Sequence, residues 1–179
     1  MNKTAQIELH RTFLIERLPE PLTTASSHLQ LYDNYIENTR LRLRQIRDPY
    51  AKTWIRILQQ RMPATESGMA MTKFAEIHLN DDEYRLFERF EAREIRKNRY
   101  FHEIDLVSVA FDIFLGPLFG LTTARVDFET KEALENYFPP PFFIFEVSND
   151  PFFAGENLVA KTFTEVRAEV QKVGSEPPV

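Results

Sequence analysis

The stretch that decides the fold is Arg40-Leu41-Arg42-Leu43-Arg44. In an extended strand successive side chains point to opposite faces, so the three arginines share one face and the two leucines share the other. Like charges in neighbouring positions repel one another unless they face water or an anion. The stretch therefore leaves two arrangements open: an ordinary antiparallel strand with one wet face, or a strand whose guanidiniums line an enclosed polar cavity.

The same one-sided placement of ionisable residues recurs in other segments that read as strands. These residues are Glu8, His10 and Thr12 in 6–15, Arg56 in 52–60, Lys97 and Arg99 in 97–104, and Arg125 in 121–128. If these strands close into a barrel, the charged groups either coat its outside or line its bore. Both arrangements fit the alternation.

Apolar periodicity and turn residues divide the rest of the chain. We expect strands at 6–15, 29–37, 40–46, 52–60, 72–79, 97–104, 106–115, 121–128 and 142–147. Helices are expected from Asn80 to about residue 95, at 129–137, and over 158–170, with a loop at 62–71. Asn80-Asp81-Asp82-Glu83 supplies a capping side chain and first-turn acids, which favour the start of a helix. The pattern predicts one mainly β domain over 1–173 with flanking helices and a disordered tail at 174–179.

Composition narrows the class of protein. The formal net charge of −5 argues against a nonspecific nucleic-acid binder, and locally grouped arginines in an acidic chain favour a focused anion site. The sequence has no cysteine, which excludes disulfides, thiolate metal ligands and a cysteine nucleophile. No run of residues is long and apolar enough to span a bilayer, and 1–6 hold no signal-peptide core. We therefore expect a cytoplasmic protein that binds neither nucleic acid nor membrane, and we leave a homodimer open.

With these segments in order, the chain resembles the CYTH family of triphosphate tunnel metalloenzymes from Ile7 to about Phe163. The family's opening Glu-x-Glu-x-Lys frame, its Leu-Arg-x-Arg, Lys-x-Arg-Tyr, Asp-before-Phe and Gly-Leu signals, and its Glu-Val-Thr segment have counterparts here. They are Glu8-Leu9-His10-Arg11-Thr12, Leu41-Arg42-Leu43-Arg44, Lys97-Asn98-Arg99-Tyr100, Asp112-Ile113-Phe114, Gly120-Leu121, Glu146-Val147-Ser148 and Asn157-Leu158. The resemblance implies a closed eight-stranded antiparallel barrel whose charged bore, or tunnel, binds a small-molecule triphosphate or polyphosphate.

The resemblance also implies roles for individual residues. Phosphate contacts would come from Arg42, Arg44, Arg56, Lys97, Arg99 and Arg125, catalytic roles would fall to Glu8 and Lys97, and a divalent ion, Mg²⁺ or Mn²⁺, would be held by Glu8, His10, Asp127 and Glu146. Arginine suits the phosphate role because its planar fork donates to two oxygens at once. Hard divalent cations prefer carboxylate oxygens.

Departures from the family pattern fall mainly on the metal side. His10 stands where the second Glu of the opening motif would be, Thr12 replaces its Lys, and Arg125 replaces an acid. The sequence therefore leaves several functions open. They are a metal-dependent triphosphatase, a non-catalytic polyanion-binding module of the same fold, a class IV adenylate cyclase, and an unrelated β-barrel carrier with an apolar lumen and exposed Arg42 and Arg44.

Overall fold

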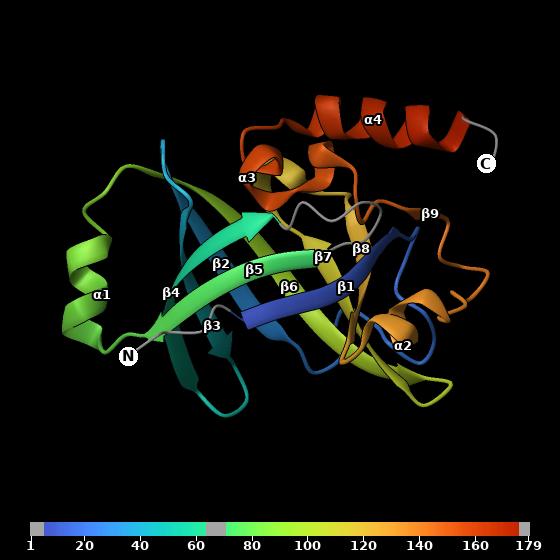
Figure 1. Ribbon diagram of the computed structural model, residues 1–179, viewed down its shortest axis with the longest axis horizontal. Helices are drawn as coiled ribbons and strands as arrows, with labels where there is room; N and C mark the ends of the chain where they lie inside the picture. The colour runs from blue at the N-terminus through green and yellow to red at the C-terminus, as the bar shows by residue number, and fades with distance from the viewer. Residues whose placement is uncertain (1–5, 64–70, 176–179) are drawn as a thin grey trace.

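The computed structural model describes residues 6–63 and 71–175 (Figure 1). Within them the chain forms nine strands and four α-helices. The strands are β1 (Gln6–Leu14), β2 (Leu29–Ile36), β3 (Leu41–Asp48), β4 (Thr53–Pro63), β5 (Met71–His78), β6 (Ala92–Ile104), β7 (Val107–Phe114), β8 (Thr122–Phe128) and β9 (Phe145–Glu146). The helices are α1 (Asp81–Phe87), α2 (Lys131–Glu135), α3 (Gly155–Leu158) and α4 (Phe163–Ser175), with short 3₁₀ turns at Gly116–Leu118 and Pro151–Phe153.

Eight of the strands close into an antiparallel barrel, which confirms the predicted fold class. The order is β5-β4-β3-β2-β6-β7-β8-β1, and β1 also pairs with β5, so the sheet meets itself. The short β9 adds to the far end of β1, where Phe13 lies opposite Glu146. A closed barrel has no free edge, which removes the edge pairing that open sheets must prevent.

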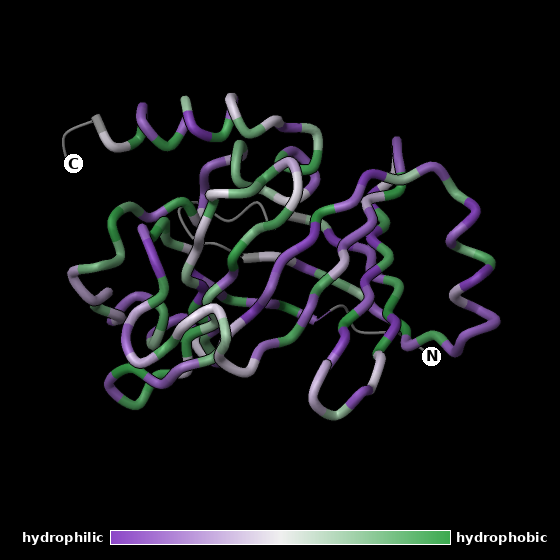
Figure 2. Tube along the Cα trace, turned by 180° about the vertical axis from the view of Figure 1, so that it is seen from behind, coloured by the Kyte–Doolittle hydropathy of each residue, from purple (hydrophilic) through white to green (hydrophobic). Residues whose placement is uncertain are grey.

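The core lies outside the barrel as well as within it, as the alternation in the strands predicted. Aromatic and aliphatic residues from the outer faces of β1, β6, β7 and β8 form one cluster under the segment that follows α2: Phe13, Ile15, Tyr100, Val109, Phe111, Ala124, Val126 and Phe143. A second cluster packs beneath α3 and α4 at one end of the barrel. The hydropathy colouring in Figure 2 shows polar and apolar residues alternating along several strands, as expected when one face is apolar and the other is polar. The ionisable face is therefore left for the bore.

Three predicted elements differ from the structure. The helix that opens at Asn80 does so with the expected capping box, but it ends at Phe87 rather than near residue 95. Residues from Ala92 belong to β6, because this segment pairs with β2 from Ile36↔Ala92 onward. The ladder hydrogen bonds and the burial of Ile95, which is 4% exposed, outweigh its helical spacing with Phe87.

The C-terminal elements are also shorter than predicted. The helix expected at 158–170 is divided into α3 and α4, because Thr162 accepts a hydrogen bond from the Glu165 backbone N–H and starts a new helix. The strand expected at 142–147 contracts to Phe145–Glu146. Helix α4 extends to Ser175, and the remainder of the predicted tail, 176–179, lies outside the described residues, as do positions 64–70 of the predicted loop.

The outer aromatic cluster yields a prediction about stability. Phe111 is 0% exposed and Phe138 is 90% exposed. Replacing Phe111 by Ala should lower the free energy of unfolding by about 3–5 kcal/mol, because it removes buried apolar surface and leaves a cavity. The matched Phe138→Ala change should stay within about 0.5 kcal/mol. Chemical denaturation of both variants measures the difference, and equal losses would contradict this assignment of the core.

Candidate functional site

The bore of the barrel holds a cavity of about 510 Å³ lined mainly by charged and polar side chains. Its ionisable lining includes six cations and four carboxylates from the strands: Arg42, Arg44, Arg61, Lys97, Arg99, Arg125, Glu8, Asp33, Asp112 and Asp127. The segment from Val147 to Leu158 lines the cavity too, and it brings α3 against Tyr35. A Cβ on Gly155 would lie 1.8 Å from the Tyr35 hydroxyl, so a glycine is needed for this close approach.

The first charged group in the cavity is a carboxylate from β2 shared by two arginines from β3. The register places Asp33 opposite Arg44 and Tyr35 opposite Arg42. Arg44 donates from Nε and Nη2 to the two oxygens of Asp33 at 2.5 and 2.7 Å, and Arg42 Nη1 lies 3.6 Å from Oδ2. Burial alone would raise the pKa of Asp33, but the two guanidiniums outweigh it and hold the pKa far below its usual range. Asp33 is thus a fixed anion that orients both arginines.

A second group repeats this arrangement on β6 and β7. Arg99 donates from Nε and Nη2 to the two oxygens of Asp112 at 2.7 Å each, and Lys97 Nζ lies 2.6 Å from Oδ2. Burial is again outweighed by the cations, so the pKa of Asp112 is held well below its ordinary value. Burial lowers the pKa of Lys97 to about 8, although Asp112 opposes the shift. Lys97 is therefore the cation here that loses its proton most easily.

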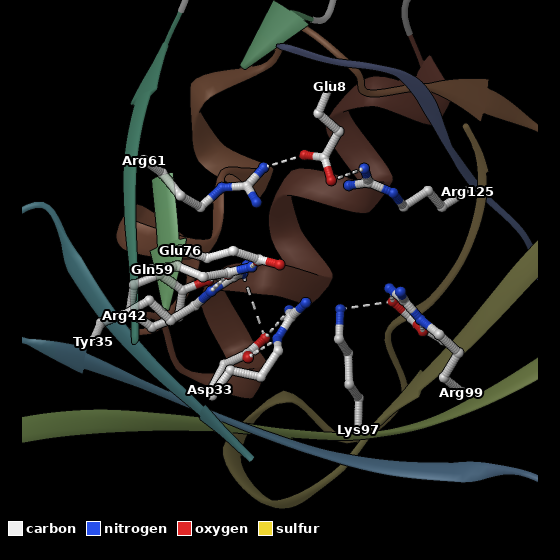
Figure 3. A network of polar contacts seen from close by, with 12 residues as sticks. Glu8, Asp33, Tyr35, Arg42, Gln59, Arg61, Glu76, Lys97, Arg99 and Arg125 are labelled. Carbon is white, nitrogen blue, oxygen red and sulfur yellow. Dashed lines mark hydrogen bonds and ion pairs between the residues drawn. The ribbon is translucent and has the colours of Figure 1, made fainter. Parts of the chain in front are cut away.

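A third group spans the seam of the barrel. The Glu8 carboxylate on β1 receives Arg61 from β4 at one oxygen and Arg125 from β8 at the other, the latter at 2.9 Å (Figure 3). Burial would raise the pKa of Glu8, but Arg125 and Arg61 outweigh it and lower the pKa from 4.5 to about 2. Arg125 also binds Asp127 at 2.6 Å. Each of the three groups thus contains two cations and one shared carboxylate.

The interior of the cavity also contains amides and an imidazole. Arg42 Nε donates to Gln59 at 3.0 Å, and Gln59 in turn donates to Glu76 at 2.6 Å (Figure 3). His10 lies opposite Asp127 in the register of β1 and β8, and its buried Nδ1 has no hydrogen-bond partner. Burial, with Arg125 adding to it, lowers the pKa of His10 to about 4, so the imidazole is neutral at pH 7.

Most of the sequence-predicted residues meet in this cavity, but two do not. Arg56 is on the outward face of β4, where it pairs with Asp81 at 2.5 Å and lies over the rings of Trp54 and Tyr84. Glu146 lies opposite Phe13 and so shares its outward face, where its carboxylate binds Arg11 at 2.5 Å. The interpretations of Arg56 as a phosphate contact and Glu146 as a metal ligand are therefore wrong on geometry, because each side chain is on the outer side of the wall.

The prediction of an apolar carrier is also wrong. Arg42 is 7% exposed and lines a charged cavity, so the guanidiniums of β3 face inward rather than toward bulk solvent. Arg40, the first arginine of the stretch, precedes β3 and is exposed. The alternation of the stretch was read correctly for the other two arginines.

Sequence reasoning missed four residues of the cavity: Asp33, Tyr35, Gln59 and Arg61. A signal was present for two of them, because Asp33 and Tyr35 alternate in phase and a turn near Asn38 brings them opposite Arg44 and Arg42. Arg61 was missed because strand 52–60 was expected to end one residue too early. It has the same parity as Gln59, which pairs with Arg42 across β3 and β4.

The carboxylates present do not fit a resident divalent ion. Over the described ranges 6–63 and 71–175, no three His, Asp or Glu side chains are grouped to hold a metal. Both oxygens of Glu8 face guanidiniums, Arg125 also binds Asp127, and Glu146 lies outside the cavity. A cation placed beside Glu8 would meet two positive charges as well as the negative one. The sequence-predicted metal set therefore does not converge.

Comparison with known proteins agrees with the fold. No protein-family model matches the sequence. An inorganic triphosphatase of Nitrosomonas europaea is 27% identical over 154 residues, covering 84% of this chain and 95% of that protein. The solved structure of the inorganic triphosphatase NE1496 superposes with a TM-score of 0.57 at 20% identity, covering 86% of this chain and 95% of that one. The PH1819 protein of Pyrococcus horikoshii OT3 superposes with a TM-score of 0.52 at 14% identity, covering 94% and 91%.

No helix among the described residues has both the length and the apolar character that a membrane crossing requires.

The Glu8 group predicts how stability depends on pH. The pKa of Glu8 is lower in the folded chain than the ordinary 4.5, so its carboxylate stabilises the fold above about pH 4.5. That contribution is lost as the pH falls toward about 2. Glu8→Gln should therefore show a shallower loss of unfolding free energy between pH 5 and pH 2 than the unmodified protein. Denaturant titrations across this range test the prediction, and identical pH slopes would contradict it.

Proposed function

The chain is a divergent CYTH-like tunnel protein, and we propose that its cavity binds inorganic triphosphate and hydrolyses one of the phosphoanhydride bonds. The observation that carries the proposal is the set of three groups, each with two cations sharing one carboxylate. Each group keeps one net positive charge, so the cavity presents three separated positive centres. A linear anion with three phosphoryl groups matches that distribution.

The buried carboxylates prepare the cations for such a ligand. Asp33 and Asp112 are each 2% exposed and hold Arg44 and Arg99 through both carboxylate oxygens. These contacts use two of the five N–H donors of each guanidinium, so further donors remain for phosphate oxygens. Because the side chains are already oriented, binding costs little conformational entropy.

Hydrolysis requires water to attack a terminal phosphorus while the bond to the bridging oxygen breaks, giving phosphate and diphosphate. Arginines that hold the leaving diphosphate would stabilise the charge that develops on it. Lys97, with its pKa lowered to about 8 by burial, still carries a proton at pH 7 and can give it to the leaving oxygen. Glu8 takes part by positioning Arg61 and Arg125. The relative from Nitrosomonas europaea, an inorganic triphosphatase, supports this activity.

A non-catalytic polyanion binder of the same fold is the second candidate. It is favoured by the donor set around Glu8, which does not fit the divalent ion that the family resemblance implies. Phosphate release separates the two. We expect release from inorganic triphosphate, with slower or no release from ATP and thiamine triphosphate. Binding without release would select the polyanion binder.

Variants test the charge arrangement directly. Arg44→Gln and Arg99→Gln should each weaken triphosphate binding by about tenfold or more, because each removes charge-assisted hydrogen bonds. Arg47→Gln is the matched control. It lies on β3 but contacts Gln30 and the ring of Trp54 on the outside of the barrel, and its binding should not change. Isothermal titration calorimetry measures all three, and equal affinities would contradict the proposal.

A further inference from the structure

The wall formed by β1, β4 and β8 carries an anion site where the family pattern would place a metal. Glu8 stands between Arg61 and Arg125, and all three side chains point into the bore (Figure 3). Next along β1, the second acid of the family motif is replaced by His10, which adds no negative charge while neutral. The local excess of charge on this wall is therefore positive, which repels a divalent cation and attracts an anion.

The Glu8 group is held less tightly than the other two. Each of its guanidiniums gives Glu8 a single nitrogen, Nη2, whereas Arg44 and Arg99 each grip a carboxylate through two nitrogens. The Glu8 side chain is 26% exposed, against 2% for Asp33 and 3% for Asp112. Of the three shared carboxylates, Glu8 is thus the one that an incoming anion can displace.

A buried atom beside this group supports the same conclusion. Nδ1 of His10 lines the cavity wall and has no hydrogen-bond partner within the described residues. A buried polar atom without a partner is destabilising, and a ligand that supplies one removes the cost. In the tautomer that carries its proton on Nδ1, the imidazole could donate to a phosphate oxygen placed between Arg61 and Arg125.

We propose that Arg61 and Arg125 form a phosphate subsite in which Glu8 is a resident counter-anion, displaced when triphosphate binds as the metal-free anion. The inference rests on the proposed function, because it names the ionic form of the same substrate. It reverses the role that the family pattern implies for Glu8. The carboxylate keeps the two arginines in place in the empty cavity and does not serve as a metal ligand.

Calorimetry with sodium triphosphate in EDTA and in excess Mg²⁺ tests the proposal. We expect binding in EDTA at least as tight as in Mg²⁺, because the magnesium complex has less negative charge to offer the arginines. Arg61→Gln and Arg125→Gln should each weaken binding in EDTA by about tenfold or more. Glu8→Gln should retain or tighten it, because the competing anion is gone, and Arg47→Gln again serves as the unchanged control.

Two results would overturn the proposal. One is binding that requires Mg²⁺. The other is a Glu8→Gln variant that loses affinity, only when Mg²⁺ is present, while Arg61→Gln does not. Titration of Mn²⁺ alone, followed by electron paramagnetic resonance, gives an independent readout. We expect no uptake by the ligand-free protein, and uptake abolished by Glu8→Gln would contradict the counter-anion role. Absence of triphosphate binding in both buffers would instead refute the proposed function itself.

Discussion

The structure depends on the sharing of single carboxylates between pairs of cations inside a closed barrel. Six positive side chains in one enclosed space would repel one another strongly without compensation. Asp33, Asp112 and Glu8 each lie between two of them, which offsets the repulsion while leaving an excess of positive charge in the cavity. The same contacts fix the side-chain geometry, so stability and anion recognition come from one set of interactions.

Barrel closure makes this sharing possible. Asp33 and Asp112 meet their arginines across neighbouring strands of a hairpin or ladder, whereas Glu8 meets Arg61 and Arg125 from two different walls. That contact exists because β1 pairs with both β5 and β8 and so joins the two edges of the sheet. At one end, α3 lies against Tyr35 through Gly155, so the C-terminal segment becomes part of the cavity wall.

The three groups also differ in a way that matters for function. Two carboxylates are almost completely buried and gripped through both oxygens, so they act as a permanent frame for Arg44 and Arg99. Glu8 is partly exposed and contacts one nitrogen of each guanidinium, so it can exchange with a ligand. In our interpretation the fold keeps a rigid phosphate cradle on one wall and an exchangeable position on the other.

The sequence by itself determined the strand alternation, the mainly β class and the arginine-rich faces of 40–46 and 97–104. Those features follow from neighbouring residues and from the two-residue period of a strand. Only the tertiary structure decided which face is inside, and it did so through register. A shift of one residue placed Arg56 and Glu146 on the outer surface and brought Arg61, outside the expected strand, into the cavity. The partner of Glu8 could not be predicted, because Arg61 is 53 residues away in the sequence and meets Glu8 only when the barrel closes.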